Sequence, residues 1–304
     1  EVEVDEDAVL AVGARAGRDK VTFVTSPTLE AFPAWQEQLI AESTGKDDTG
    51  IVPVADEPLA GPGAYGEDRV FVYFYLHGEQ DRDTIETLSA LDEAGHPVIS
   101  VRLDDRYDLA RAMYRWEMGV AAAGAVLGIH PFNQPNVEAA KRLAREAMQA
   151  ENGAGSDTHT VAADDHDVLE RELADWLDAA DETGYLGVQA YLPPSDETTA
   201  ALTDLVTALR DTTGCATTLG YGPRFLHSTG QLHKGGPPNG LFLQLVDTPD
   251  ATGPVPETDY TFEELIAAQA TGDHQALREA DRTVLRVRVD DDSLGDLAEA
   301  IRAR

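Results

Sequence analysis

Apolar residues along this chain fall into short continuous runs that alternate with longer stretches of helical periodicity. Continuous apolar runs are typical of strands covered on both faces, and strands that alternate with helices form parallel sheets. In the first half, the predicted strands are Lys20–Thr25, Arg69–Leu76 and Pro97–Leu103, and the predicted helices are Leu29–Glu42, Asp83–Ala94, Leu109–Leu127 and Pro135–Gln149. Residues 1–150 are therefore predicted to be a doubly wound parallel α/β domain.

The long stretch Leu109–Leu127 is rich in small residues, which predicts a helix buried on several sides. The composition then changes from Asn152 to about Asp167, where Gly, Ser, Thr, Asp and His dominate. We interpret residues 151–182 as an acidic linker with a helix. Residues 183–304 are a second, smaller α/β region. Its predicted elements are the strands Tyr185–Leu192, Gly240–Val246 and Thr283–Val289 and the helices Asp196–Asp211 and Thr261–Ala280.

The chain is strongly acidic. Its 56 acidic residues outnumber its 23 basic residues and give a net charge of −33. The excess is spread along the chain, which has only four lysines. Such a surface is typical of adaptation to high salt, where screening weakens self-repulsion; an ordinary acidic protein is the alternative. The charge argues against binding nucleic acid or an anionic membrane surface.

The single cysteine, Cys215, excludes a disulfide framework and favours a reducing, cytoplasmic compartment. The longest run of small apolar residues, Met118–Ile129, is much shorter than the ~20 residues that a membrane span needs. The stretch from Gly61 to Gly66 fits the spacing GxGxxG, but it leads into a strand rather than a helix, so a turn is the better interpretation. The acidic residues around His166 could hold a metal ion or form a solvated linker, and we favour the linker. No cofactor is predicted.

Three segments carry groups suited to catalysis. In the first, Gln38 and Glu42 are four residues apart, so a helix presents both on one face and ends just after Glu42. In the second, Gln134 lies at the start of a helix begun by Pro135, and Lys141 follows two turns later on the same side. The alternatives are a solvated glutamate in the first segment and an ordinary exposed lysine in the second.

The third segment, Gly220–Pro237, is rich in glycine and concentrates ionisable side chains. It contains Arg224, His227, Ser228, His233 and Lys234. Loops with several ionisable groups frequently form functional sites, although a polar structural loop is the alternative.

The segment Gln38-Leu-Ile-Ala-Glu42-Ser43-Thr-Gly45-Lys46 resembles the signature Q-x-x-x-E-S-x-G-K of the phosphoglucose (glucose-6-phosphate) isomerase family. The stretches Leu127–Lys141 and Leu226–Gln231 resemble two further segments of that family, L-G-x-N-P-F-D-Q-P-G-V-E-x-x-K and L-H-S-x-G-Q. The arrangement is most similar to the isomerase part of fused transaldolase/phosphoglucose isomerases. The resemblance implies sugar-isomerase (SIS) domains and isomerisation of glucose 6-phosphate and fructose 6-phosphate through a cis-enediol(ate).

The resemblance also implies roles for individual residues. Glu42 is expected to move a proton between C1 and C2, with His227 in ring opening and Lys141 beside it. The expected substrate-binding residues are Gln38, Gln134, Ser43, Lys46 and Lys234. The family needs no metal or organic cofactor, and it forms homodimers that share active sites.

Two family elements, an S-x-S-G-T-T phosphate loop and a G-G-R segment, are not found in the sequence, nor is a transaldolase portion. The chain is therefore expected to be the C-terminal part of a larger enzyme. The alternatives are a non-catalytic SIS module that binds sugar phosphates and an isomerase of the same fold for another sugar phosphate.

Overall fold

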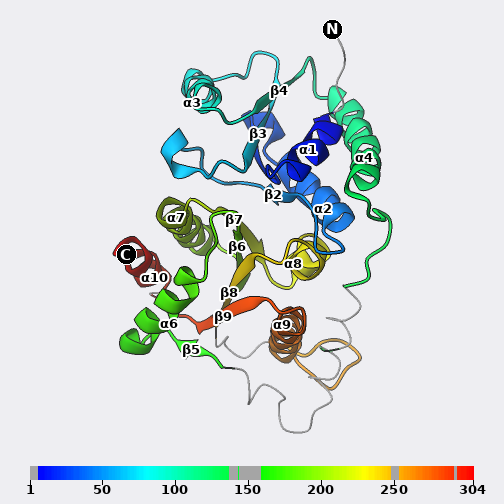
Figure 1. The fold of residues 1–304 in the computed structure, drawn as a ribbon. Coiled ribbons are helices and arrows are strands. Elements are labelled where there is room, and N and C mark those ends of the chain that lie inside the picture. The colour runs from blue at the N-terminus through cyan, green and yellow to red at the C-terminus, as the bar shows by residue number, and fades with distance from the viewer. Residues whose placement is uncertain (1–5, 137–142, 144–158, 248–252, 291–292) are drawn as a thin grey trace.

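The computed structural model describes residues 6–136, 143, 159–247, 253–290 and 293–304. These residues form two parallel sheets, one in the upper and one in the lower half of Figure 1. The prediction of a parallel α/β fold is confirmed. The helix predicted from Pro135 lies almost entirely outside the described residues.

The first sheet has the strand order β2-β1-β3-β4, and every neighbouring pair is parallel. Its strands are β1 (Lys20–Thr25), β2 (Val52–Val54), β3 (Arg69–Leu76) and β4 (Val98–Leu103). Helices α1 (Glu6–Arg15), α2 (Phe32–Thr44) and α4 (Asp108–Leu127) cover one face, and α3 (Arg82–Glu93) covers the other (Figure 1). Two short 3-10 helices, η1 (Pro27–Leu29) and η2 (Pro62–Ala64), lie in the connections.

The core of this sheet follows directly from its apolar runs. The bounds of β1 and β3 are those predicted, and the inward side chains of both strands meet α4. The indole of Trp116 packs against the rings of Phe23 and Phe74, with centroids 5.6 and 5.9 Å apart. Aromatic side chains of this size bury the largest apolar areas, so this contact fixes α4 against the sheet.

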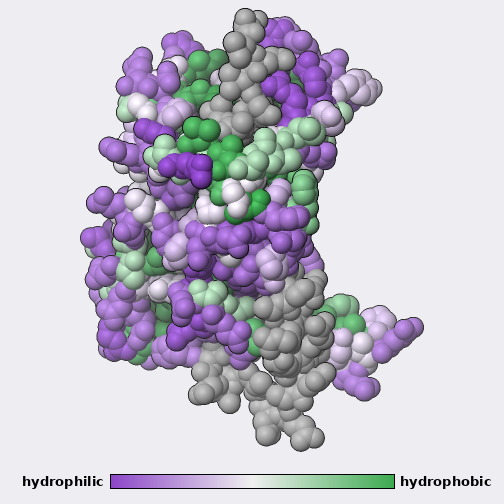
Figure 2. Space-filling model, turned by 45° about the vertical axis from the view of Figure 1, so that its right-hand side comes forward, coloured by the Kyte–Doolittle hydropathy of each residue, from purple (hydrophilic) through white to green (hydrophobic). Residues whose placement is uncertain are grey.

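The prediction that the small-residue helix is buried on several sides is wrong for its first half, whereas none of the residues from 119 to 124 is exposed. Tyr107, just before α4, and Tyr114 and Met118 within it are all more than half exposed. Figure 2 shows a hydrophobic area in the upper half of a surface that is otherwise mostly hydrophilic.

Within the described residues, no helix combines the length and the apolarity needed to cross a membrane.

The second sheet has the order β5-β9-β8-β6-β7 and is also entirely parallel. Its strands are β5 (Val161–Ala162), β6 (Tyr185–Tyr191), β7 (Ala216–Tyr221), β8 (Gly240–Val246) and β9 (Thr283–Arg288). Helices α6 (His166–Asp178), α7 (Asp196–Thr213) and α10 (Ser293–Arg302) lie on one side, and α8 (Gly230–Gly235) and α9 (Phe262–Glu279) on the other (Figure 1).

The segment Gly220–Pro237, expected to be a loop, is largely helical in the structure. It forms the 3-10 helix η3 (Arg224–His227) followed by α8. All six residues of α8 are buried, so this short helix is a packing element between the two sheets.

The two sheets share one apolar cluster, so they form a continuous junction. Its buried members are Ala41, Val52, Val54, Tyr185, Ala216, Leu232, Phe242 and Leu277. The turn after α2 lies so close to α8 that a Cβ at Gly45 would be 2.4 Å from the Cα of Leu232. The Asp48 N–H donates to the Gly235 carbonyl at 3.0 Å.

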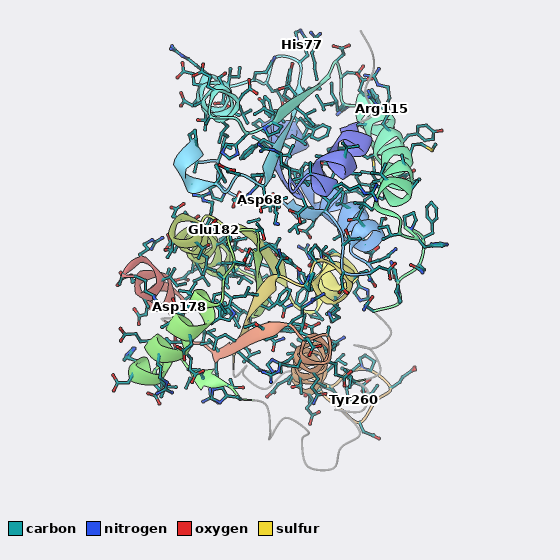
Figure 3. All side chains as sticks on the ribbon, viewed as in Figure 1. Asp68, His77, Arg115, Asp178, Glu182 and Tyr260 are labelled. Atoms are coloured by element: carbon teal, nitrogen blue, oxygen red, sulfur yellow. The ribbon has the colours of Figure 1, made fainter. Side chains whose placement is uncertain are left out.

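Charged groups reinforce the junction. The ammonium of Lys20 lies 2.6 Å from Asp19 and 3.0 Å from Asp68, and it donates to the Thr183 carbonyl of the second half. Figure 3 shows Asp68 and Glu182 where the two halves meet. Lys20, Lys46 and Lys234 are all at least 95% buried, so the lysines that the structure describes belong to the interior.

We predict that Gly45→Ala separates the two sheets locally, because the new Cβ meets the backbone of Leu232 rather than a flexible side chain. Overpacking of this kind costs about 1–3 kcal/mol of unfolding free energy. Chemical denaturation in high salt measures the loss. Gly61→Ala is the control, since a Cβ there has no neighbour within 4 Å. Equal stability of the two variants would contradict the prediction.

Candidate functional site

The half-buried Glu42 lies in the last turn of α2 and is the centre of a cluster of polar side chains. Gln38 and Gln134 form side-chain hydrogen bonds with its carboxyl group, and the charges of His227 and Lys46 also act on it. Burial raises the pKa of Glu42, and these four neighbours partly offset that rise. The three segments singled out in the sequence therefore meet at one carboxyl group.

A single buried amide, that of Gln231 in α8, joins the backbone of these segments. Its Nε2 donates to the Gly45 carbonyl and to Oδ1 of Asn136, both at 2.8 Å. Its Oε1 accepts from the Asn136 N–H at 3.1 Å. Because Gln231 is fully buried, losing one of these partners would leave a polar atom without water. The amide thus fixes the end of α2, the Gln134 segment and α8 in one arrangement.

Lys46 supplies a cation on the inner side of the cluster. Its side chain is 2% exposed, and its ammonium donates to the His130 carbonyl at 2.9 Å. Burial lowers the pKa of Lys46, while the charges of Glu42 and Asp47 oppose this effect. Asp47 and Asp48 both have positive φ, which lets the chain turn sharply after the lysine.

The remaining expected site residues lie in different surroundings. Ser43 is half-buried in the last turn of α2, and His227 is exposed at the end of η3. Lys234 is buried in the second half, where its ammonium lies 2.5 Å from Asp273, and it is not among the groups that act on Glu42. Lys141 lies outside the described residues. The roles of all these residues stay predictions.

A second polar group on α2 was not predicted from the sequence. Glu37 lies in a cavity of about 240 Å³ between α2, the segment after β2, α7, β7 and η3. Burial raises the pKa of Glu37 to about 7. The hydrogen bond from Ser228 and the charge of Arg224 lower this pKa, whereas the charge of Asp56 raises it further. Only the position next to Gln38 connects Glu37 with the site in the sequence, and spacing alone does not reveal its burial.

No group of three or more His, Cys, Asp or Glu side chains that could hold a metal ion occurs in the part of the chain that the structure describes. The groups that meet at Glu42 are its own carboxyl group, two amides, an ammonium and an imidazole. This set can move protons and stabilise a negatively charged oxygen.

Comparison with known proteins finds no matching family model. The chain is similar to three glucose-6-phosphate isomerases. They are those of Latilactobacillus sakei (30% identity, 38% of this chain, 34% of the relative), Rubrobacter xylanophilus (31%, 44% and 40%) and Pediococcus pentosaceus (32%, 38% and 34%). The matches thus span only about a third to two fifths of each relative's length. The chain is homologous to these isomerases over part of its length.

Among solved structures, the chain aligns with a hypothetical protein from Thermus thermophilus at 14% identity and a TM-score of 0.38, covering 99% of this chain and 80% of that one. It also aligns with the C-terminal domain of glucosamine-fructose-6-phosphate aminotransferase from Francisella tularensis at 9% identity and a TM-score of 0.27, covering 100% and 87%. Similarity at this level adds nothing to the account of the site.

We predict that Glu37→Gln changes how stability depends on pH. The folded protein holds the Glu37 proton up to about pH 7, whereas the unfolded chain releases it near its ordinary pKa of 4.5. This group therefore favours folding at low pH, and its contribution is lost as the pH rises from 4.5 to 7.

Across that interval, wild type should lose about 1–3 kcal/mol of unfolding free energy that Glu37→Gln does not lose. Denaturation at several pH values measures the difference. The control is Glu30→Gln, at an exposed position just before α2. Parallel pH curves for wild type and Glu37→Gln would show that the Glu37 carboxyl is not buried as described.

Proposed function

We propose that this chain carries the acid–base machinery of a sugar-phosphate isomerase that interconverts glucose 6-phosphate and fructose 6-phosphate. The observation that carries the proposal is the meeting of Gln38, Gln134, Lys46 and His227 at the carboxyl group of Glu42. The partial homology to glucose-6-phosphate isomerases supports the choice of substrate.

In this mechanism, Glu42 takes the proton from C2 of the open-chain aldose and returns it to C1, with a cis-enediol(ate) between the two steps. One base must reach both carbons, and a carboxyl group whose pKa is raised by burial holds and releases a proton closer to neutral pH. The hydrogen bonds with Gln38 and Gln134 orient this carboxyl group.

Two neighbours serve the other steps. The buried ammonium of Lys46 offsets negative charge that develops on the enediolate oxygens. The imidazole of His227 can both donate and accept a proton, which suits ring opening, and it acts on Glu42 from within the same chain. We propose Lys141 as a second cation beside it, on the basis of the family resemblance. A homodimer with shared sites stays a prediction.

A non-catalytic module that binds sugar phosphates is the second candidate. It is favoured by the limited span of the matches, which leave well over half of each relative without a counterpart in this chain. Turnover separates the two candidates, because a module binds the sugar phosphate and leaves it unchanged.

We predict that the protein isomerises fructose 6-phosphate in high salt and that Glu42→Gln lowers kcat by about 10²–10⁴-fold, the usual effect of one positioned proton-transfer group. The measurement is a coupled assay of glucose 6-phosphate formation. Glu93→Gln, in the last turn of α3 and exposed to solvent, is the matched control and should keep wild-type turnover.

Near-normal turnover of Glu42→Gln would remove this carboxyl group from the mechanism. Binding of fructose 6-phosphate by wild type without turnover would reject the isomerase proposal and support the binding module.

A further inference from the structure

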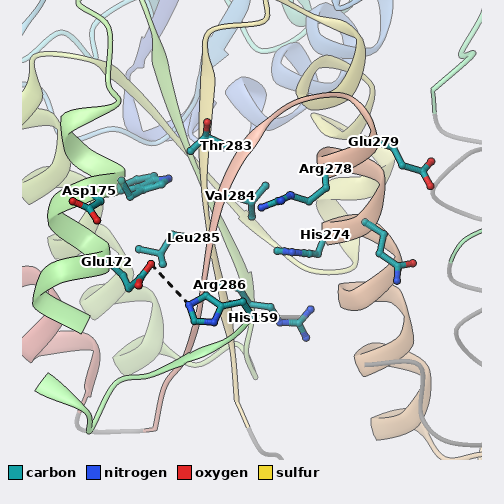
Figure 4. A pocket seen from close by; sticks show the side chains of 12 residues that line it. His159, Glu172, Asp175, His274, Arg278, Glu279, Thr283, Val284, Leu285 and Arg286 are labelled. Carbon is teal, nitrogen blue, oxygen red and sulfur yellow. Dashed lines mark ion pairs between the residues drawn. The ribbon is translucent and has the colours of Figure 1, made fainter. Parts of the chain in front are cut away.

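A groove of about 740 Å³ runs along β9 of the second sheet, between α6, which lies on one side of the sheet, and α9, which lies on the other (Figure 4). None of the side chains that act on Glu42 lines it. The groove is therefore a separate feature of the second half of the molecule.

One wall of this groove is basic. Figure 4 shows His274 and Arg278 projecting from α9 and Arg286 extending from β9 toward α9. The exposed carboxylate Glu279 of α9 also lines the groove. His274 is only 8% exposed, and its Nδ1 has no hydrogen-bond partner among the described residues. Nε and Nη1 of Arg286 are also buried and equally without a partner there. Buried polar nitrogens of this kind are normally satisfied, so these three atoms lack partners among the described residues.

This lack of partners is notable in a chain where acidic residues outnumber basic ones 56 to 23. Neither Arg278 nor Arg286 forms an ion pair with a residue that the structure describes. The carboxylate whose charge reaches Arg286 is that of Asp273, and it is already paired with Lys234 at 2.5 Å. With Asp273 paired to Lys234, the two arginines of this wall outnumber its one remaining carboxylate, Glu279, so one positive charge remains there.

The imidazole fits an acceptor ligand as well. Burial, followed by the charges of Arg286 and Arg278, lowers the pKa of His274 to about 4. At neutral pH the ring is therefore uncharged, and it can donate one hydrogen bond to a bound oxygen.

The opposite wall is acidic. Glu172 and Asp175 line the groove from α6. The Nε2 atom of His159 lies 3.9 Å from Oε2 of Glu172. Carboxylates repel an anion but accept hydrogen bonds from hydroxyl groups. The groove is also larger than a single inorganic anion requires. A fitting ligand therefore has an anionic end and a hydroxylated end.

We propose that this groove binds a hydroxylated phosphate monoester, with its phosphate against Arg278, Arg286 and His274 and its hydroxyl groups toward Glu172 and Asp175. A phosphate is favoured over a carboxylate because two separate guanidinium groups and a ring line the same groove. A carboxylate is satisfied by a single guanidinium fork, whereas a phosphate offers three outer oxygens.

Calorimetric titration with glycerol 3-phosphate tests the proposal, because this probe is a phosphate monoester with two hydroxyl groups. Arg286→Met and Arg278→Met should each weaken binding by about tenfold or more, as expected for a lost charge-assisted hydrogen bond. Arg288→Met, exposed at the end of β9 and outside the groove lining, is the matched control and should bind like wild type. Arg278 is also exposed, so its variant keeps the test valid if Arg286→Met fails to fold.

Further measurements test which wall binds the phosphate and which binds the hydroxyl groups. Glu172→Gln should weaken binding of glycerol 3-phosphate but not of inorganic phosphate, and glycerol alone should not bind. Glu42→Gln should leave the affinity unchanged, which separates this groove from the proposed active site. No binding by wild type, or equal affinity in all the arginine variants, would overturn the proposal.

Discussion

The buried amide of Gln231 is the contact on which the arrangement of the candidate site depends. It joins the turn after α2, the Asn136 backbone and α8, three stretches that are distant in the sequence. A side-chain amide has its donors and its acceptor in one plane, so its hydrogen bonds fix both the spacing and the relative orientation of these segments. The close approach of Gly45 to Leu232 shows how little freedom remains at this junction.

The same junction determines the chemistry of the groups within it. Glu37, Glu42 and Lys46 lie where the two sheets meet. Burial raises the pKa of both glutamates and lowers that of the lysine, and so favours the neutral form of each. Most carboxylates of the described residues are instead exposed to solvent. Groups with shifted pKa values also occur elsewhere, such as His274 in the groove along β9, but three of them gather at this junction. Gathered groups of this kind are a frequent mark of functional sites.

The sequence predicted three of the four strands of the first sheet, because continuous apolar runs such as Arg69–Leu76 identify buried parallel strands on their own. It missed β2, whose three residues are too few to form such a run. It did not reveal β7, whose Thr-rich stretch lacks that signal, or α8, which is too short and glycine-rich to show a helical period. For the site, helical spacing paired Gln38 with Glu42, and resemblance singled out His227. The contacts of Gln231 and the burial of Glu37 depend on tertiary packing, which no local pattern encodes.

The lysines have a practical consequence for chemical labelling. Lys20, Lys46 and Lys234 are enclosed by carboxylates or carbonyl oxygens, so acylating reagents cannot reach their amines in the folded state. In the part of the chain that the structure describes, covalent tagging of lysine side chains therefore requires the packing around them to open transiently. The extent of tagging over time would then report how often this protein opens, rather than what its outer surface displays.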